Sequence, residues 1–72
     1  MIKFENQENG RYFYIQVERD LFDELCLRVV RGGRHVRGIS HIVTVGSRKT
    51  IRAEIKRLSR LRLQRGYTLI ND

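Results

Sequence analysis

Residues 47–66 of this chain read SRKTIRAEIKRLSRLRLQRG, a stretch that carries the signals of a complete helix. Ser47 is a residue type favoured at helix N-caps, and Gly66 is typical of the position that follows a helix. The apolar residues that share one third of the circumference at about 100° per residue are Ile51, Ile55, Leu58 and Leu61. The pattern therefore predicts a helix through about Arg65 that buries this apolar face in the core.

The segments before this helix alternate apolar and more polar residues, as strands do. Residues 12–17 are aromatic and β-branched, and they form the clearest strand of the chain. Further strands are predicted at residues 2–5, 25–30 and 36–45. After the helix, residues 67–70 predict either a last short strand or a segment packed against the sheet.

Glycines mark the expected changes of direction. Asn9 and Gly10 both tolerate positive φ and predict a turn, and residues 31–34 predict a chain reversal that glycines allow without strain. Gly38 predicts a bend in the strand that follows. The chain is therefore expected to be an α+β domain, a small twisted antiparallel sheet of three to five strands with one long C-terminal basic amphipathic helix packed on it.

The chain has 72 residues, no proline and no internal repeat, which predicts one domain over residues 1–72 with a small core. Its first residues lack the apolar segment of a signal peptide, and no window approaches the roughly eighteen apolar residues of a membrane helix. The single cysteine, Cys26, cannot form an internal disulfide. These features predict a cytoplasmic protein without membrane contact, and they leave its oligomeric state open.

The net charge of +7 comes entirely from the second half of the chain. Residues 1–36 hold six basic and six acidic residues, whereas residues 37–72 hold nine basic and two acidic ones. Twelve of the fifteen cations are arginine, whose planar guanidinium suits bidentate contacts with phosphate. A polyanion is therefore the expected partner.

One side of the predicted helix carries only cations. They follow one another at i+3 or i+4 spacing and are Lys49, Arg52, Lys56 and Arg60. Like charges at this spacing repel by a few tenths of a kcal/mol per pair. Arg48 and Lys49 also lie in the first turn, where the helix dipole already places positive charge. Such uncompensated repulsion indicates a site for an anion, and the competing interpretation is a solvated helix surface.

Residues 31–38 interleave cations with glycines. Glycines let the backbone approach a phosphate, and we expect Gly33, Arg34 and Arg37 to hold it from this loop. An ordinary hairpin loop is the alternative interpretation of the same residues.

No pattern in the chain indicates catalysis, a metal site or a cofactor. His35 and His41 have no Cys, Asp or Glu at ligand spacing, and Cys26 lies in an apolar strand pattern typical of a packed thiol. A phosphate-binding loop and a nucleophile elbow are both missing. The least favoured alternative is an RNA-directed ribonuclease in which His35, His41 or Tyr67 acts as acid or base.

Three stretches of the chain resemble the WGR domain, a module of several poly(ADP-ribose) polymerases and of small bacterial proteins. These stretches are residues 11–17, 27–34 and 58–67. At the triplet that names the family, Gly33 and Arg34 match, whereas Gly32 stands in place of the tryptophan. In the polymerases the tryptophan and arginine of the triplet contact DNA at a strand break. The resemblance therefore implies nucleic-acid binding through Arg34 and the helix.

We expect a non-catalytic module that binds nucleic acid, double-stranded DNA rather than RNA, through phosphate contacts with little sequence specificity. The expected binding residues are Gly33, Arg34, Arg37, Arg48, Lys49, Arg52, Lys56 and Arg60. The alternative function is a protein-interaction module, an inhibitor or adaptor, that docks its basic face on an acidic protein partner.

Overall fold

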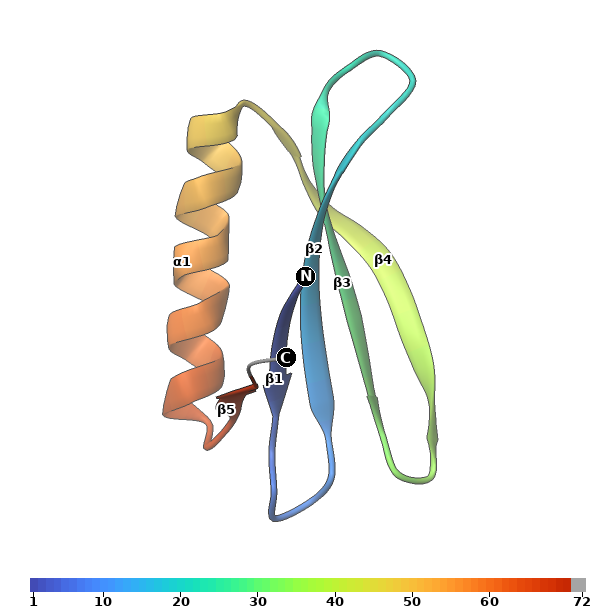
Figure 1. Ribbon diagram of the computed structural model, residues 1–72, viewed down its shortest axis with the longest axis vertical. Coiled ribbons are helices and arrows are strands. Elements are labelled where there is room, and N and C mark those ends of the chain that lie inside the picture. The colour runs from blue at the N-terminus through green and yellow to red at the C-terminus, as the bar shows by residue number, and fades with distance from the viewer. Residues whose placement is uncertain (71–72) are drawn as a thin grey trace.

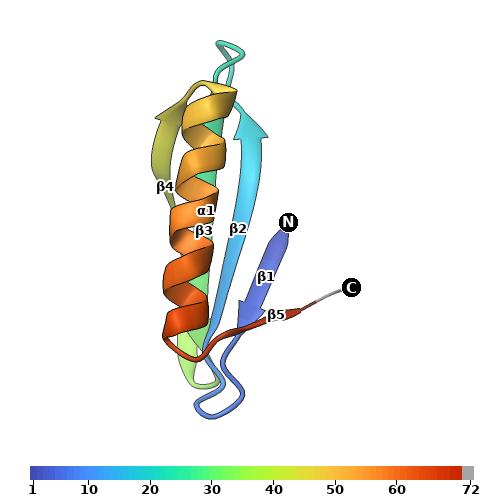
Figure 2. The ribbon, with the colours of Figure 1, turned by 90° about the vertical axis from the view of Figure 1, so that its left-hand side faces the viewer.

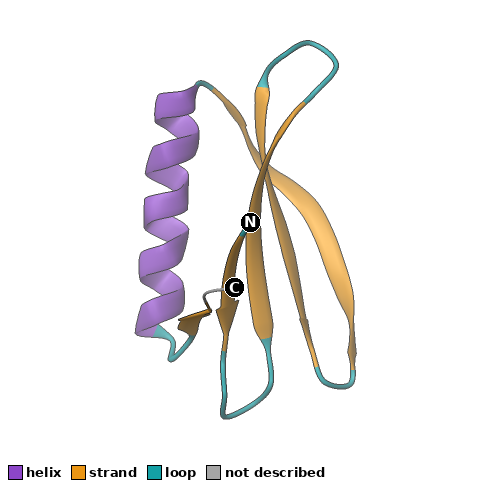
Figure 3. Cartoon of the chain, viewed as in Figure 1, coloured by secondary structure: helices purple, strands orange, loops and turns teal. Residues whose placement is uncertain are grey.

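The computed structural model describes residues 1–70 and contains five strands and one helix in this part of the chain (Figure 1). The elements are β1 (Ile2–Glu5), β2 (Tyr12–Arg19), β3 (Leu25–Gly33), β4 (Val36–Gly46), α1 (Arg48–Gln64) and β5 (Thr68–Ile70). The strands form one sheet in the order β4-β3-β2-β1-β5, and every neighbouring pair is antiparallel. Loops and turns lie only at the two ends of the strands (Figure 3).

Helix α1 lies across one face of this sheet and leaves the opposite face uncovered (Figures 1 and 2). The core between the two layers consists of Phe4, Phe13, Ile15, Leu27, Val29, Ile51 and Leu58. The register explains this set, because Phe4 pairs with Phe13 and Ile15 with Val29, and directly opposed residues point to the same face. The α+β architecture predicted from the sequence is confirmed.

The ends of α1 follow the predicted caps. The Ser47 side chain accepts a hydrogen bond from the Thr50 backbone N–H at 3.2 Å, and Gly66 continues after the helix with φ of +87°. The apolar helix face is confirmed for three of its four predicted residues, since Ile51 and Leu58 are buried and Ile55 packs against the core, whereas Leu61 is half-buried outside the core cluster. The segment after the helix pairs as β5 with β1.

The turn between β1 and β2 is fastened to the end of the helix by Asn6, the one buried polar residue among those described. Its Oδ1 accepts hydrogen bonds from the N–H groups of Glu8 at 3.0 Å and Asn9 at 3.4 Å. Its Nδ2 donates to the carbonyl of Arg65 at 3.5 Å. The predicted turn is confirmed with Gly10 at φ of +73°, and it lies beside the C-terminal end of α1.

The reversal predicted within residues 31–34 is wrong in its position. Strand β3 continues through Gly33, and the two-residue turn consists of Arg34 and His35. Among residues 1–70 the only glycines with positive φ are Gly10 and Gly66, so the glycines at 32 and 33 do not serve the chain reversal.

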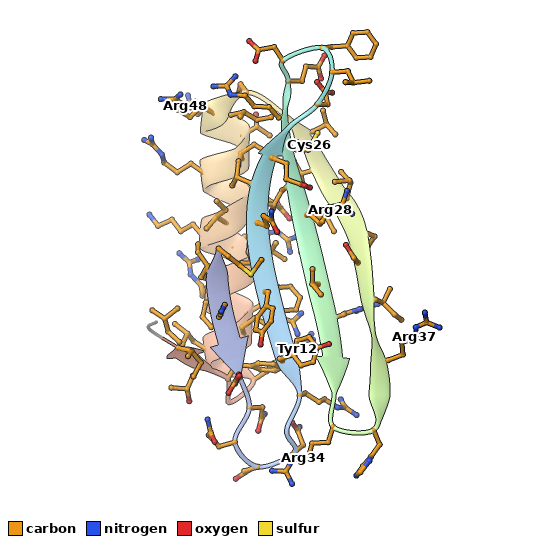
Figure 4. All side chains as sticks on the ribbon, turned by 45° about the vertical axis from the view of Figure 1, so that its right-hand side comes forward. Tyr12, Cys26, Arg28, Arg34, Arg37 and Arg48 are labelled. Atoms are coloured by element: carbon orange, nitrogen blue, oxygen red, sulfur yellow. The ribbon has the colours of Figure 1, made fainter. Side chains whose placement is uncertain are left out.

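The absence of a side chain at Gly32 and at Gly38 makes room for the Tyr12 ring. A Cβ on Gly32 would lie 2.5 Å from the Tyr12 hydroxyl, and a Cβ on Gly38 would lie 2.6 Å from it. Tyr12 thus lies over the backbones of β3 and β4 on the open face, with its ring centroid 4.9 Å from that of Tyr14 (Figure 4). The ladder between β3 and β4 shifts register opposite Gly38, which agrees with the predicted bend.

This arrangement predicts that Gly38→Ala destabilises the fold by about 1–2 kcal/mol, because the added methyl group displaces the Tyr12 ring from its stack. In a Tyr12→Phe background the same substitution is expected to be tolerated, since the nearest remaining ring atom lies 3.8 Å from the Cβ position. Urea denaturation of the single and double variants measures this coupling.

Gly32→Ala is the matched control for this coupling. Its Cβ position lies 2.7 Å from Tyr12 Cζ, so Tyr12→Phe is expected not to rescue it fully. Equal costs of Gly38→Ala in the two backgrounds would contradict the contact.

Candidate nucleic-acid interface

The predicted row of cations occupies the outer side of α1, away from the sheet. Its members Lys49, Arg52, Lys56 and Arg60 are all exposed. Within residues 1–70 none of these four side chains forms an ion pair or hydrogen bond. The row therefore presents uncompensated positive charge to solvent.

The one acidic residue of the helix, Glu54, pairs with Arg57 and not with the row of cations. Glu54 accepts hydrogen bonds from Arg57, one of them from Nε at 3.2 Å, and the two side chains form a salt bridge three residues apart. The hydrogen bond from Arg57 lowers the pKa of Glu54, so the carboxylate stays charged and paired. Glu54 thus neutralises Arg57 and not the row beside it.

Arg48 lies apart from the hairpin arginines at the opposite end of the molecule (Figure 4). It lines an open depression together with Arg19, Asp23 and Glu24, where the loop between β2 and β3 meets the helix N-terminus. Arg48 therefore lies close to carboxylates, which reduces its contribution to a phosphate site.

The hairpin residues predicted to bind phosphate lie near the C-terminal end of α1. The Arg34 side chain crosses Gly10 of the neighbouring turn, and Arg37 projects from β4 (Figure 4). Gly33 ends β3 beside the Arg11 side chain. The structure thus separates the eight predicted residues into a row along the helix with Arg48 at its start and a hairpin group at the other end.

A basic groove near this hairpin was missed by the sequence interpretation. It has a volume of about 330 Å³ and is lined by residues from β2, β3, β4 and the end of α1. Its cations are Arg11, Arg31, Arg62 and Arg65, and Tyr12, Tyr67 and Phe13 supply aromatic surface. No acidic residue of the described chain lines it, so its charge adds to that of the helix row.

Arg62 connects this groove with the core. Its guanidinium carbon lies 4.0 Å from the centroid of the Phe13 ring and 5.5 Å from that of Tyr67, and its Nε is buried without a hydrogen-bond partner. Helical spacing could have revealed this position, because Arg62 follows Ile51 by eleven residues and lies about 20° from it around the helix. Because Arg62 is charged, the sequence interpretation did not place it on the buried face of the helix.

The fold does not bring together His35, His41 and Tyr67, the side chains considered as acid or base of a ribonuclease. Tyr67 lines the groove, whereas His35 lies in the β3–β4 turn and His41 lies on β4 opposite Val29. Cys26 is buried, and burial followed by the charge of Asp20 raises the pKa of its thiol. A raised pKa disfavours the thiolate that a nucleophile requires.

Residues 1–70 contain neither a candidate metal cluster nor a helix that could span a membrane. No group of three or more His, Cys, Asp or Glu residues in this part of the chain could hold a metal ion. None of its helices has the length and apolar character required to cross a bilayer.

No family model matches this chain, and comparison with curated proteins and with solved structures found no significant match.

Proposed function

We propose that this domain is a non-catalytic module that binds double-stranded DNA through phosphate contacts, with little sequence specificity. The observation that carries the proposal is the row Lys49, Arg52, Lys56 and Arg60, which is exposed and unpaired within the described residues. A folded chain gains nothing internally from four neighbouring like charges. A polyanion relieves their repulsion and releases its own condensed counterions.

The spacing of the row suits a nucleic-acid backbone. Neighbouring members lie three or four residues apart, which places their Cβ atoms about 5–6 Å from one another along one side of the helix. Duplex DNA offers one phosphate charge for about every 1.7 Å of its axis, so several phosphates lie within reach. Phosphate contacts carry no sequence information, which supports binding with little base discrimination.

The hairpin group and the basic groove extend this positive surface at the C-terminal end of α1. Arg34, Arg37 and the guanidinium groups of the groove would hold additional phosphates there. The resemblance to the WGR domain leads to the same proposal, with Gly33 and Arg34 as the shared residues. A cytoplasmic location, in association with nucleic acid, is part of the proposal.

Fluorescence anisotropy with duplex DNA, duplex RNA and single strands at several salt concentrations tests this function. If four to six phosphates are engaged, the slope of log K against log salt is expected to be about −4 to −5 for duplex DNA. We expect weaker binding to duplex RNA. A slope near zero, or no binding to any probe at low salt, would refute the proposal.

The alternative is a protein-interaction module whose basic face docks on an acidic partner. Leu21 and Phe22 favour it, because they are 99% and 84% exposed at the tip of the β2–β3 loop and the DNA proposal gives them no role. Exposed apolar side chains of this kind commonly anchor protein interfaces. Loss of all nucleic-acid binding in the assay above would favour this alternative.

A further inference from the structure

The two edges of the sheet differ in length and protection. The β5 edge has only three residues, which is one way in which proteins avoid edge pairing. The β4 edge has eleven residues, and positions 36–43 are all exposed. Eleven residues at about 3.3 Å each make an edge of at most roughly 36 Å, in a molecule 39 Å long.

Strand β4 lacks most of the side chains that prevent pairing with another strand, although its ladder with β3 shifts register at two places, between Leu27 and Arg28 and between Arg31 and Gly33. It contains no proline, no lysine and no acidic residue, and Arg37 is its one fully charged side chain. Its exposed apolar side chains are Val36, Ile39, Ile42, Val43 and Val45. In residues 1–70 no other segment covers this edge, since α1 lies on the face of the sheet (Figure 2).

The two ends of the sheet next to this edge differ in charge. The loop between β2 and β3 holds the carboxylates of Asp20, Asp23 and Glu24; Asp23 is paired with Arg19, and Arg48 at the helix N-terminus lines the same depression. The opposite end of β3 and β4 holds Arg31, Arg34 and Arg37, none of which forms an ion pair within the described residues (Figure 4). An antiparallel neighbour of the same sequence would place each acidic end beside a basic end.

We propose that β4 pairs antiparallel with β4 of a second copy of this chain, forming a symmetric dimer with a continuous ten-stranded sheet. The occupant of the edge is a second copy, because the charge pattern is complementary to itself under the twofold rotation that antiparallel strands impose. Arg37 of each copy then lies at the Gly46 end of its partner, where Glu24 precedes the neighbouring strand β3. The apolar side chains of the two β4 strands cover one another at the centre.

The symmetry of this pairing places both helices on the same side of the joined sheet. Directly opposed residues of antiparallel strands point to the same face, so the twofold axis runs perpendicular to the sheet. The two basic rows would then lie on one surface and run in opposite directions. The dimer itself does not depend on the proposed DNA function, because its test uses protein alone.

Sedimentation velocity of the full chain, from micromolar to millimolar concentration and without nucleic acid, tests the pairing. We expect a species of twice the 8.6 kDa chain mass. The double variant Ile39→Lys and Ile42→Lys is expected to raise the dissociation constant by about 100-fold, because it brings like charges together across the joined edges. A wild-type chain that stays monomeric throughout would overturn the proposal.

The matched control is the double variant Leu63→Lys and Leu69→Lys, which makes the same change of charge at side chains 56% and 48% exposed and away from β4. It is expected to leave the dimer intact. Loss of the dimer in this control alone, or persistence in the β4 variant, would place the interface elsewhere and overturn the proposal.

A second pair of variants, which exchanges the charges of Arg37 and Glu24, tests the pairing if the lysine variants fail to fold. Arg37→Glu is expected to weaken the dimer several-fold because each new carboxylate faces an acidic end. Adding Glu24→Arg is expected to restore most of the wild-type association. Equal weakening in the single and double variants would contradict the antiparallel register.

Discussion

Replacing Arg52 and Lys56 by glutamate is expected to lower the affinity for duplex DNA by about 100-fold or more at low salt. Both side chains are exposed on α1 and unpaired among the described residues, so the substitution removes two phosphate contacts and adds repulsion in their place. The salt slope is expected to become shallower by about 2, because two fewer phosphates are neutralised. Fluorescence anisotropy measures both quantities.

The helix itself should tolerate this double substitution. The double substitution turns the repulsion of two neighbouring pairs of the row, 49/52 and 56/60, into attraction and leaves one repulsive pair, 52/56, so the helical state is not disfavoured. Circular dichroism is therefore expected to show an unchanged fold, so a loss of affinity can be assigned to the binding surface.

The matched control is the double variant Lys3→Glu and Arg19→Glu, which makes the same change in net charge at two residues outside α1. Lys3 lies on the open face of the sheet, 5.7 Å from the Tyr14 ring, and Arg19 ends β2. We expect only a modest, salt-screened loss of affinity in this control. An equal loss in both variants would show that net charge or the open sheet face, and not the helix row, determines binding.

The largest effect on stability is expected for Leu27→Ala, with a loss of about 2–5 kcal/mol in the free energy of unfolding. Leu27 is 0% exposed in β3, the strand between β2 and β4, and belongs to the core that α1 covers. Native proteins in general are stable by only about 5–15 kcal/mol, so the cavity removes a large fraction of the total. Urea denaturation followed by circular dichroism measures the change.

Leu21→Ala provides the matched control, since it is the same substitution at a side chain that is 99% exposed. It is expected to change the free energy of unfolding by less than about 0.5 kcal/mol. Similar costs at the two positions would contradict the core as described, because burial alone distinguishes them.

The identity of the elements and their succession along the chain follow from local sequence patterns. The Ser47 and Gly66 signals bounded the helix, and the alternation in residues 12–17 identified a central strand. These features depend on local physical chemistry, namely the periods of helix and strand and the backbone preferences of capping residues. Local interactions of this kind are visible within a few residues of chain.

The distribution of cations on the helix was also accessible from the sequence. Helical spacing placed Lys49, Arg52, Lys56 and Arg60 on one side, and the structure has all four exposed. The same reasoning failed for Arg62, which lies at core spacing and stacks on Phe13, because a charged residue was not expected to contribute to the buried face.

The neighbours that a residue acquires across the sheet become visible in the folded chain alone. Tyr12 lies over Gly32 and Gly38, which are twenty and twenty-six positions away in the chain, and this contact explains glycines that a turn does not need. The separation of Arg48 from Arg34 and Arg37, and the long unprotected edge of β4, likewise follow from strand order. Strand order and register arise from the joint packing of distant segments, and a local residue pattern does not encode which strand becomes the neighbour or the edge.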